Sequence, residues 1–405
     1  MKKQDISAAQ RWPAAYAQPT SDFHQLHEMA SGFTGLSDFG NTSYQQSLKV
    51  LLHSYDADPY LTPEGRERCH RSIVGGLVGR LLSEQQWKQN PRVLQHRIEA
   101  PIIIAGLPRT GTTALHELLA ADAQFQQLEF WLGNSPMPRP PRSEWESLPP
   151  YRQTVDFIND FYERVPSMRA IHHMTASMPE EDRTLLMQEF AHLWYMESAF
   201  VPEYDYWVEQ HDAAIGYQRF ADNLRLIGSN DCDKRWVLKD PVHLMFMDDL
   251  LDTFPDACII QTHRDPAMSI PSLCSLVWQF RGYFENPDND PMLIGKRKVE
   301  HWARALDITA KVRDRRPERF MDIHLADIVS KPLPVVEKIY AFCGLKLGDD
   351  ARGRMMQWVE HNRQGKHGAH DYELETFGLG DDIITQAFAG YRENYGIARE
   401  KKVQP

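Results

Sequence analysis

The residues with the clearest chemical meaning are the eight of Gly106–Thr113, which read GLPRTGTT. They lie between a short apolar run, PIIIA, and a segment with helical spacing, TTALHELLAAD. In a strand-to-helix turn of this kind, glycines let the backbone turn sharply, and successive N–H groups and the helix N-terminus face an anion. The sequence therefore predicts a phosphate-binding loop.

This loop differs from that of ATP- and GTP-hydrolysing proteins at one position. Their pattern is GxxxxGK[ST], in which the lysine reaches the terminal phosphates and the hydroxyl holds magnesium. Thr112 occupies the lysine position here, and Arg109 is the only cation within the loop. We therefore expect the loop to bind a donor group of lower charge than a magnesium-bound triphosphate.

Several segments in the same order along the chain resemble one known family. PIIIAGLPRTGTTALHELLA is similar to the 5'-phosphosulfate loop of the sulfotransferases that use 3'-phosphoadenosine-5'-phosphosulfate (PAPS), in a branch common in bacteria. Thr262–Pro266, with Ser272 beyond it, resembles that family's 3'-phosphate segment. Asn362–Gly368, followed by LETFGL, resembles its second nucleotide-binding loop. With WVLKDPVHL and FMDIHLADIVSKPLPVVEKIYAFCGL, the resemblance covers about residues 95–395.

The resemblance implies roles for the residues of these segments. Arg109 would lie against the bridging and sulfuryl oxygens, where negative charge develops as the donor cleaves. In the best-known eukaryotic cytosolic branch a lysine stands at this place, and arginine differs from it in keeping its charge at all relevant pH. The 5'-phosphosulfate would be bound through N–H groups and hydroxyls of Thr110, Gly111, Thr112 and Thr113. The 3'-phosphate would be bound by Arg264, Ser272, Arg363 and Lys366, with Gly365 in the same loop as the last two.

The general base, which must take the proton of an acceptor hydroxyl, has two main candidates. Histidine has a suitable pKa, and His243 follows Lys239 by four residues at the end of a predicted strand, on the ligand side of the sheet. The cytosolic branch has its histidine two residues after the equivalent lysine, so the spacing differs here. Lys239 would help bind the transferring group, or would pair with a carboxylate such as Asp240.

The second candidate is the acidic pair Glu180 and Glu181 in SMPEEDRTLL, because some sulfotransferase branches use a carboxylate base and this branch carries a similar segment. A partly desolvated glutamate reaches a useful pKa. The pair also suits the first turn of a helix after Pro179, where acidic residues complement the helix dipole. His173 is a third and weaker choice. The sequence leaves these alternatives open.

The elements that must position these residues alternate between strand and helix. Four short apolar runs predict buried parallel strands at residues 101–106, 235–239, 257–262 and 319–324. Helical spacing fills residues 1–95 in part and 151–228, and the proline-rich stretch 131–150 predicts a loop. We expect an α/β, P-loop-like three-layer fold with a central parallel sheet, helices on both faces and a helical lid. The domains are a helical N-terminal annex over 1–95, an α/β domain over 96–395 with a helical insertion at about 140–230, and a C-terminal tail over 396–405.

Composition excludes several other classes of function. The formal net charge of −11 argues against a general binder of nucleic acid, because such proteins need a basic surface. No run approaches the length of a transmembrane helix and the N-terminus does not resemble a signal peptide, so we expect a cytoplasmic protein. The five cysteines and 17 histidines show no metal-ligand spacing, and we expect no metal.

The sequence thus predicts an enzyme that moves a sulfuryl group from PAPS to the hydroxyl of a small, apolar acceptor such as an alcohol, phenol, sterol or lipid, and releases adenosine 3',5'-bisphosphate. Residues 151–228 are rich in aromatic residues and methionine, which suits such an acceptor. A kinase that uses ATP and magnesium is the alternative within the same fold, and a nucleotide-binding protein without activity is a third. The resemblance also suggests a homodimer, which no residue of the sequence by itself indicates.

Overall fold

The computed structural model describes residues 18, 20–166, 168–171, 173–362 and 374–400, and the account below is of these residues. Their centre is a sheet of five parallel strands in the order β2-β3-β1-β4-β5. The strands are β1 (Ile102–Gly106), β2 (Phe125–Gln127), β3 (Arg235–Lys239), β4 (Cys258–His263) and β5 (Phe320–His324).

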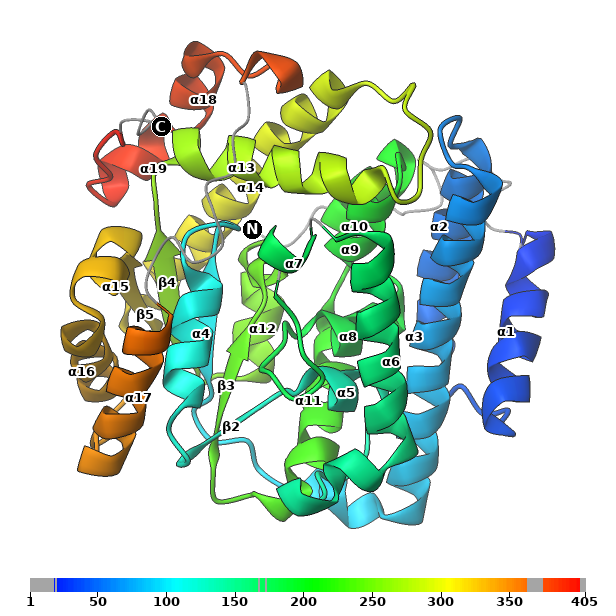
Figure 1. Cartoon of the computed structure of the whole chain (residues 1–405), viewed down its shortest axis with the longest axis horizontal. Helices are drawn as coiled ribbons and strands as arrows, with labels where there is room; N and C mark the ends of the chain where they lie inside the picture. Colours follow the sequence, from blue (N-terminus) through cyan, green and yellow to red (C-terminus); the bar gives the residue numbers. More distant parts are fainter. Residues whose placement is uncertain (1–17, 19, 167, 172, 363–373, 401–405) are drawn as a thin grey trace.

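Helices cover both faces of this sheet, and the alternation of side chains along β1 shows how. Ile102 and Ile104 belong to a core cluster shared with helices α4, α16 and α17, whereas Ile103 and Ala105 belong to the larger core on the opposite face. Every residue of β1 is buried, as expected of a central strand covered on both faces. Figure 1 shows α15, α16 and α17 gathered on one side of the sheet, with α6 and α1–α3 at the other side of the molecule.

The helices before and between the strands make up most of the chain. Those that precede β1 are α1 (Ser21–Thr34), α2 (Tyr44–Ala57) and α3 (Pro63–Gln89). Between β1 and β3 lie α4 (Thr112–Ala120), α5 (Phe130–Asn134), α6 (Pro149–Arg164), α7 (Met168–Ile171), α8 (Arg183–Leu186), α9 (Leu193–Ser198), α10 (Pro202–Gln210) and α11 (Ala214–Ile227). After β3 come α12 (Met247–Thr253), α13 (Pro266–Arg281), α14 (Pro291–Arg315), α15 (Leu325–Ser330), α16 (Pro332–Phe342), α17 (Asp349–His361), α18 (Asp381–Ala387) and α19 (Ala389–Asn394).

Short 3-10 segments connect several of these elements. They are Pro91–Gln95, Arg142–Ser147, Met187–Glu189, Gly228–Asn230, η7 (Pro241–Leu244), Pro317–Arg319 and Glu375–Phe377. In the described part of the chain, no helix combines the length and the apolar character that a membrane crossing requires.

The predicted α/β architecture is confirmed, and all four predicted strands are present within one or two residues of their expected bounds. The strand β2 was missed by the sequence analysis. The stretch expected as loop at 131–150 also contains most of α5 and one 3-10 segment. It also holds the first two residues of α6, Pro149 and Pro150, which occupy first-turn positions where no N–H donor is needed.

Candidate active site

The loop predicted to bind phosphate, Gly106–Thr113, runs from the last residue of β1 to the second residue of α4. A Cβ at Gly106 would overlap the Thr262 hydroxyl of β4, so only glycine fits between the two strands there. Gly111 takes a left-handed conformation, with φ of 89°, directly before α4, which glycine adopts without steric cost. These features let the loop turn sharply and place the N-terminus of α4 at the carboxyl edge of the sheet.

The four loop residues predicted to bind the 5'-phosphosulfate have different exposures. The Thr110 hydroxyl is buried and donates to Leu107 O at 2.6 Å, with the Thr262 hydroxyl also at 2.6 Å, so it stabilises the loop internally. Thr112 is buried with 5% of its surface exposed, whereas Thr113 is exposed. Both Thr112 and Thr113 line the cavity described below.

Arg109 lies at the outer side of this loop, with a left-handed backbone (φ of 70°) and an exposed side chain. Its Nε donates to Ser272 Oγ of α13 at 3.3 Å. Non-glycine residues seldom adopt this conformation, and such strain is concentrated at functional sites. The structure thus brings together two residues that the sequence analysis had assigned to opposite ends of the donor.

Arg264 follows β4 and lies beside the same loop. Its Nη1 donates to the Arg109 carbonyl oxygen at 3.2 Å, and its Nε lies 3.3 Å from a carboxylate oxygen of Glu400. Arg264, Ser272 and Arg109 therefore form one basic and polar edge at the carboxyl ends of β1 and β4. Arg363, Gly365 and Lys366, the other residues assigned to the 3'-phosphate, lie outside the described residues.

Lys239 and Glu181 form an ion pair next to this edge. Lys239 ends β3 with only 3% of its surface exposed, and its Nζ lies 2.7 Å from Glu181 Oε1 and 3.4 Å from Thr113 Oγ1. The chain on both sides of Glu181 is fixed by backbone hydrogen bonds, because Glu180 N donates to Leu128 O and Asp182 N donates to Lys239 O. Glu181 is thereby held at the carboxyl end of β3.

Glu180, the neighbour of Glu181, has a different environment. Its side chain is buried, and its Oε1 accepts from Glu181 N at 3.0 Å and lies 3.5 Å from Arg183 Nη2. It does not line the cavity into which Glu181 points. Of the two glutamates, only Glu181 has access to a bound molecule.

His243, the leading histidine candidate, is fully buried in η7. Its Nδ1 lies 2.8 Å from the Tyr217 hydroxyl and its Nε2 lies 3.0 Å from Asp182 Oδ2. Burial raises the pKa of Asp182 to about 6, although its hydrogen bond to His243 acts in the opposite direction. Both ring nitrogens therefore have partners inside the protein, and His243 does not line the cavity. His173, the third choice, is exposed and also lies outside that lining.

The cavity itself, which we call the active-site cavity, has a volume of about 190 Å³. Its polar wall is formed by Arg109, Thr113, Glu181 and Asp240, and its apolar wall by side chains of α9, α13 and α14 together with Phe161, Met168 and Met174. An apolar pocket with a few convergent polar groups is the usual form of a small-molecule site. Among the described residues, no cluster of histidine, cysteine, aspartate and glutamate has a geometry suited to a metal ion.

The sequence analysis missed one polar pair in this wall. His192 accepts at Nδ1 from Trp194 N at 3.1 Å, and its Nε2 lies 3.3 Å from Asp240 Oδ2. Both side chains are buried, with 4% and 2% of their surfaces exposed. Asp240 was visible in the LKDP segment as a neighbour of Lys239, but no pattern in the sequence singled out His192.

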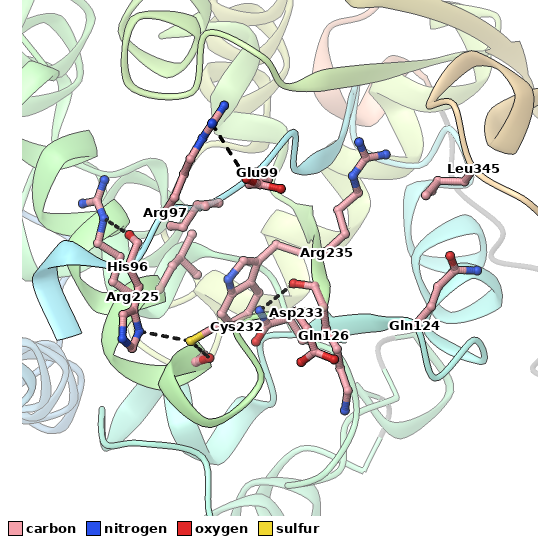
Figure 2. A pocket seen from close by; sticks show the side chains of 15 residues that line it. His96, Arg97, Glu99, Gln124, Gln126, Arg225, Cys232, Asp233, Arg235 and Leu345 are labelled. Atoms are coloured by element: carbon pink, nitrogen blue, oxygen red, sulfur yellow. Dashed lines mark hydrogen bonds and ion pairs between the residues drawn. The ribbon is translucent and has the colours of Figure 1, made fainter. Parts of the chain in front are cut away.

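A second pocket, of about 280 Å³, lies at the amino ends of the strands (Figure 2). It is lined by Arg235, the first residue of β3, and by Gln126 of β2, and the Cys232 thiol lies there 3.1 Å from His96 Nδ1. Lys239 and the phosphate-binding loop are at the opposite end of the sheet. Since ligands of open parallel sheets bind beyond the carboxyl ends of the strands, this second pocket is not the donor site.

Comparisons with known proteins agree with this geometry. The model of a family described as the sulfotransferase family matches residues 101–349. Omega-hydroxy-beta-dihydromenaquinone-9 sulfotransferase Stf3 of Mycobacterium bovis is 25% identical over 304 residues, which are 70% of this chain and 73% of the relative. The crystal structure of sulfotransferase STF1 from Mycobacterium tuberculosis H37Rv matches with a TM-score of 0.83 and 38% identity, over 92% of this chain and 98% of that one. Sulfotransferase STF9 from Mycobacterium avium matches with a TM-score of 0.87 and 27% identity, over 95% and 99% of the two chains.

Proposed function

The chain belongs to the sulfotransferase family and is a sulfotransferase enzyme, and from this premise we propose that it transfers the sulfuryl group of PAPS to the hydroxyl of an apolar acceptor. The observation that carries the proposal is the contact of Lys239 with both Glu181 and Thr113, two residues that line a largely apolar cavity next to the glycine-rich loop. The family match does not favour the kinase alternative.

The donor would lie along the carboxyl edge of the sheet. The N–H groups of Thr110, Gly111, Thr112 and Thr113 precede or begin α4, whose N-terminus favours an anion. Arg264 and Ser272 would bind the 3'-phosphate, together with Arg363, Lys366 and the backbone at Gly365. Arg109 lies between these two groups, since it contacts Ser272 through its side chain and Arg264 through its carbonyl oxygen.

The base in this proposal is Glu181 rather than His243, because Glu181 lines the active-site cavity and His243 does not. Glu181 takes the proton of the acceptor hydroxyl as the oxygen attacks sulfur, and the bond from sulfur to the 5'-phosphate oxygen breaks. Lys239 and Arg109 stabilise the negative charge that develops on the sulfuryl and leaving oxygens. The Lys239 ammonium also orients the Glu181 carboxylate, as a fixed partner at 2.7 Å.

The acceptor in this proposal is apolar around its hydroxyl. The relative Stf3 is named for a sulfotransferase of a hydroxylated menaquinone, and the active-site cavity has the aromatic and methionine lining that suits such a molecule. Polar acceptors such as sugars would leave many hydroxyls without partners against this wall, which lowers their affinity.

The donor is tested by calorimetric titration with adenosine 3',5'-bisphosphate, alongside ATP with magnesium and adenosine 5'-monophosphate. We expect tight binding of the bisphosphate alone, followed by release of bisphosphate from PAPS when apolar alcohols or phenols are added. Preferential binding of ATP with magnesium would overturn the proposed donor.

A further inference from the structure

The active-site cavity is not isolated, because a larger groove lies directly behind its apolar wall. This groove, which we call the annex groove, has a volume of about 470 Å³ and lies between α3 and α6. Phe161, Met174, Arg183, Trp194 and Phe280 line both spaces. These shared residues form the partition between the two.

The partition consists of stacked side chains rather than backbone. The Arg183 guanidinium lies over the Trp194 ring, 4.3 Å from the ring centroid, and the Trp194 and Phe280 rings are 4.7 Å apart. Arg183 also lies 3.5 Å from Glu180, the immediate neighbour of Glu181. Arg183 and Phe280 are largely buried, so the two spaces join only when these side chains change rotamer, which requires no rearrangement of the backbone between them.

The annex groove has the form of a channel for an apolar chain. Gly75, Gly76 and Gly79 of α3 line it and remove side-chain bulk along one helix. Phe157 of α6 also lines it, with 56% of its surface exposed, together with Phe130, Phe161 and Phe284. Of the residues that the structure describes, Arg68, Arg71 and Arg183 are the cationic ones that line it.

We propose that the acceptor is a long-chain amphiphile, whose hydroxyl enters the active-site cavity while its hydrocarbon chain passes the Arg183 and Trp194 pair and lies in the annex groove. This inference rests on the proposed function and adds to it the class of acceptor and the place of its chain. The observation that assigns the groove to the acceptor is that the same side chains line both the groove and the active-site cavity.

The test uses a substitution at Gly75, because a Cβ at that position meets no heavy atom within 4 Å. A side chain can therefore start at this position without a clash, and we expect the ring of Gly75→Phe to occupy the groove. The matched control is Gly32→Phe on α1, where a Cβ also meets nothing within 4 Å and the residue lines neither space. Gly75→Ala and Gly75→Leu complete the series, and thermal melting checks that each variant is folded.

The acceptors are butanol, octanol and dodecanol, with release of bisphosphate from PAPS as the readout. For the unsubstituted enzyme we expect kcat/KM to rise about threefold with each added methylene, because each one buries apolar surface. Gly75→Phe should lower kcat/KM for dodecanol at least about tenfold and leave butanol within about twofold, whereas Gly32→Phe should change neither. In equilibrium dialysis without donor, radiolabelled dodecanol should bind equally to the unsubstituted enzyme and to Gly32→Phe, and more weakly to Gly75→Phe.

The proposed reaction and the proposed place of the acceptor chain can be refuted separately. If no alcohol accepts sulfate from PAPS while dodecanol is still retained in dialysis and excluded by Gly75→Phe, the proposed reaction is wrong and the groove assignment stands. If transfer occurs with no dependence on chain length, or if Gly75→Phe leaves dodecanol binding unchanged, the groove does not hold the acceptor and belongs to another occupant, such as a helix of a partner protein.

Discussion

At the scale of single residues, the position of a carboxylate relative to the active-site cavity separates two otherwise plausible bases. His243 follows the end of β3 by four residues and Glu181 forms an ion pair with Lys239 at that same end, yet only Glu181 lines the cavity. His243 is turned inward by Asp182 and by Tyr217 of α11, which comes from a distant part of the sequence. This difference in access to the cavity arises from tertiary packing, so the residue types alone could not predict it.

Replacement of the proposed base gives the first prediction. Glu181→Gln keeps the size of the side chain and removes the proton acceptor, so kcat should fall by about 10²- to 10⁴-fold. Binding of bisphosphate, measured by calorimetry, should be retained. His243→Ala is the comparison: it leaves Asp182 buried without its partner and should lower the melting temperature, while the rate per folded molecule stays close to normal. A normal rate in Glu181→Gln together with a large loss in His243→Ala would reverse the assignment.

The charge of Arg109 gives the second prediction. Arg109→Ala should abolish measurable turnover, because the positive charge beside the leaving oxygen is lost, while bisphosphate binding stays within about tenfold. Arg109→Lys restores a cation without the planar fork and should recover part of the rate. Loss of bisphosphate binding in both variants would mean that Arg109 acts in donor binding and not in the transfer step.

At the scale of secondary-structure elements, one carboxylate joins the donor segment to the C-terminal part of the chain. Asp265 caps α13 by accepting from Ala267 N at 3.1 Å, accepts from Arg392 of α19 at 2.5 Å, and accepts from Glu400 N at 2.9 Å. It is buried, with 1% of its surface exposed. The residue before Asp265 is Arg264, so these contacts also hold the backbone of the arginine proposed to bind the donor.

Asp265→Ala should therefore affect both stability and donor binding. Removing a buried acceptor that pairs with Arg392 should lower the free energy of unfolding by about 3–5 kcal/mol, measured by urea denaturation. Bisphosphate binding should weaken as well. Asp290→Ala is the matched control, because Asp290 caps the neighbouring α14 through Met292 N at 2.9 Å but is exposed and far from the donor segment in the chain. Asp290→Ala should lower the free energy of unfolding by about 1 kcal/mol and leave bisphosphate binding unchanged. Equal effects of both variants would refute the special role of Asp265.

The sequence predicts an element of this fold only where that element has a recognisable residue pattern. The four predicted strands are apolar runs bounded by turns, and such runs are typical of buried parallel strands. The strand β2 has only three residues, two of them glutamine, so it forms no apolar run. It is recognised only by its parallel pairing with β3. The proximity of Arg109, Arg264 and Ser272 could be anticipated because each belongs to a motif that follows a strand, whereas His192 reaches the cavity through the tertiary packing of α9.

At the scale of the whole molecule, a buried acidic cluster joins the N-terminal helices to the end of α13. Thr62 N, just before α3, donates to Phe284 O, and Leu61 forms an antiparallel bridge with Glu285. Glu285 is buried, with 6% of its surface exposed, and its neighbours include Asp58 and Arg281. Burial raises the pKa of Glu285 from 4.5 to about 7, and Asp58 contributes in the same direction.

This cluster predicts how stability depends on pH. Since the folded state holds the Glu285 proton more tightly than the unfolded state, the contribution of this group to the free energy of unfolding falls as pH rises from 4.5 to about 7. Glu285→Gln removes that dependence and should raise the free energy of unfolding by about 1–3 kcal/mol near pH 8, with little change near pH 4. Denaturation at a series of pH values measures it, with Glu163→Gln on the exposed face of α6 as the control. A Glu285→Gln variant that is less stable at pH 8 would contradict it.

The contact between Arg264 and Glu400 has a consequence for how the enzyme responds to ionic strength. The Arg264 charge is already neutralised by a carboxylate of its own chain, at 3.3 Å, so an arriving phosphate exchanges with that carboxylate and not with ions from solution. The part of the bisphosphate affinity that comes from Arg264 should consequently depend less on salt than that of an unpaired arginine. In Glu400→Gln the guanidinium faces solvent ions instead, and the bisphosphate should bind more tightly in dilute buffer and lose this advantage as the salt screens the charge. Glu400 would then act as a built-in counter-ion, which makes the contribution of Arg264 to donor binding less dependent on salt.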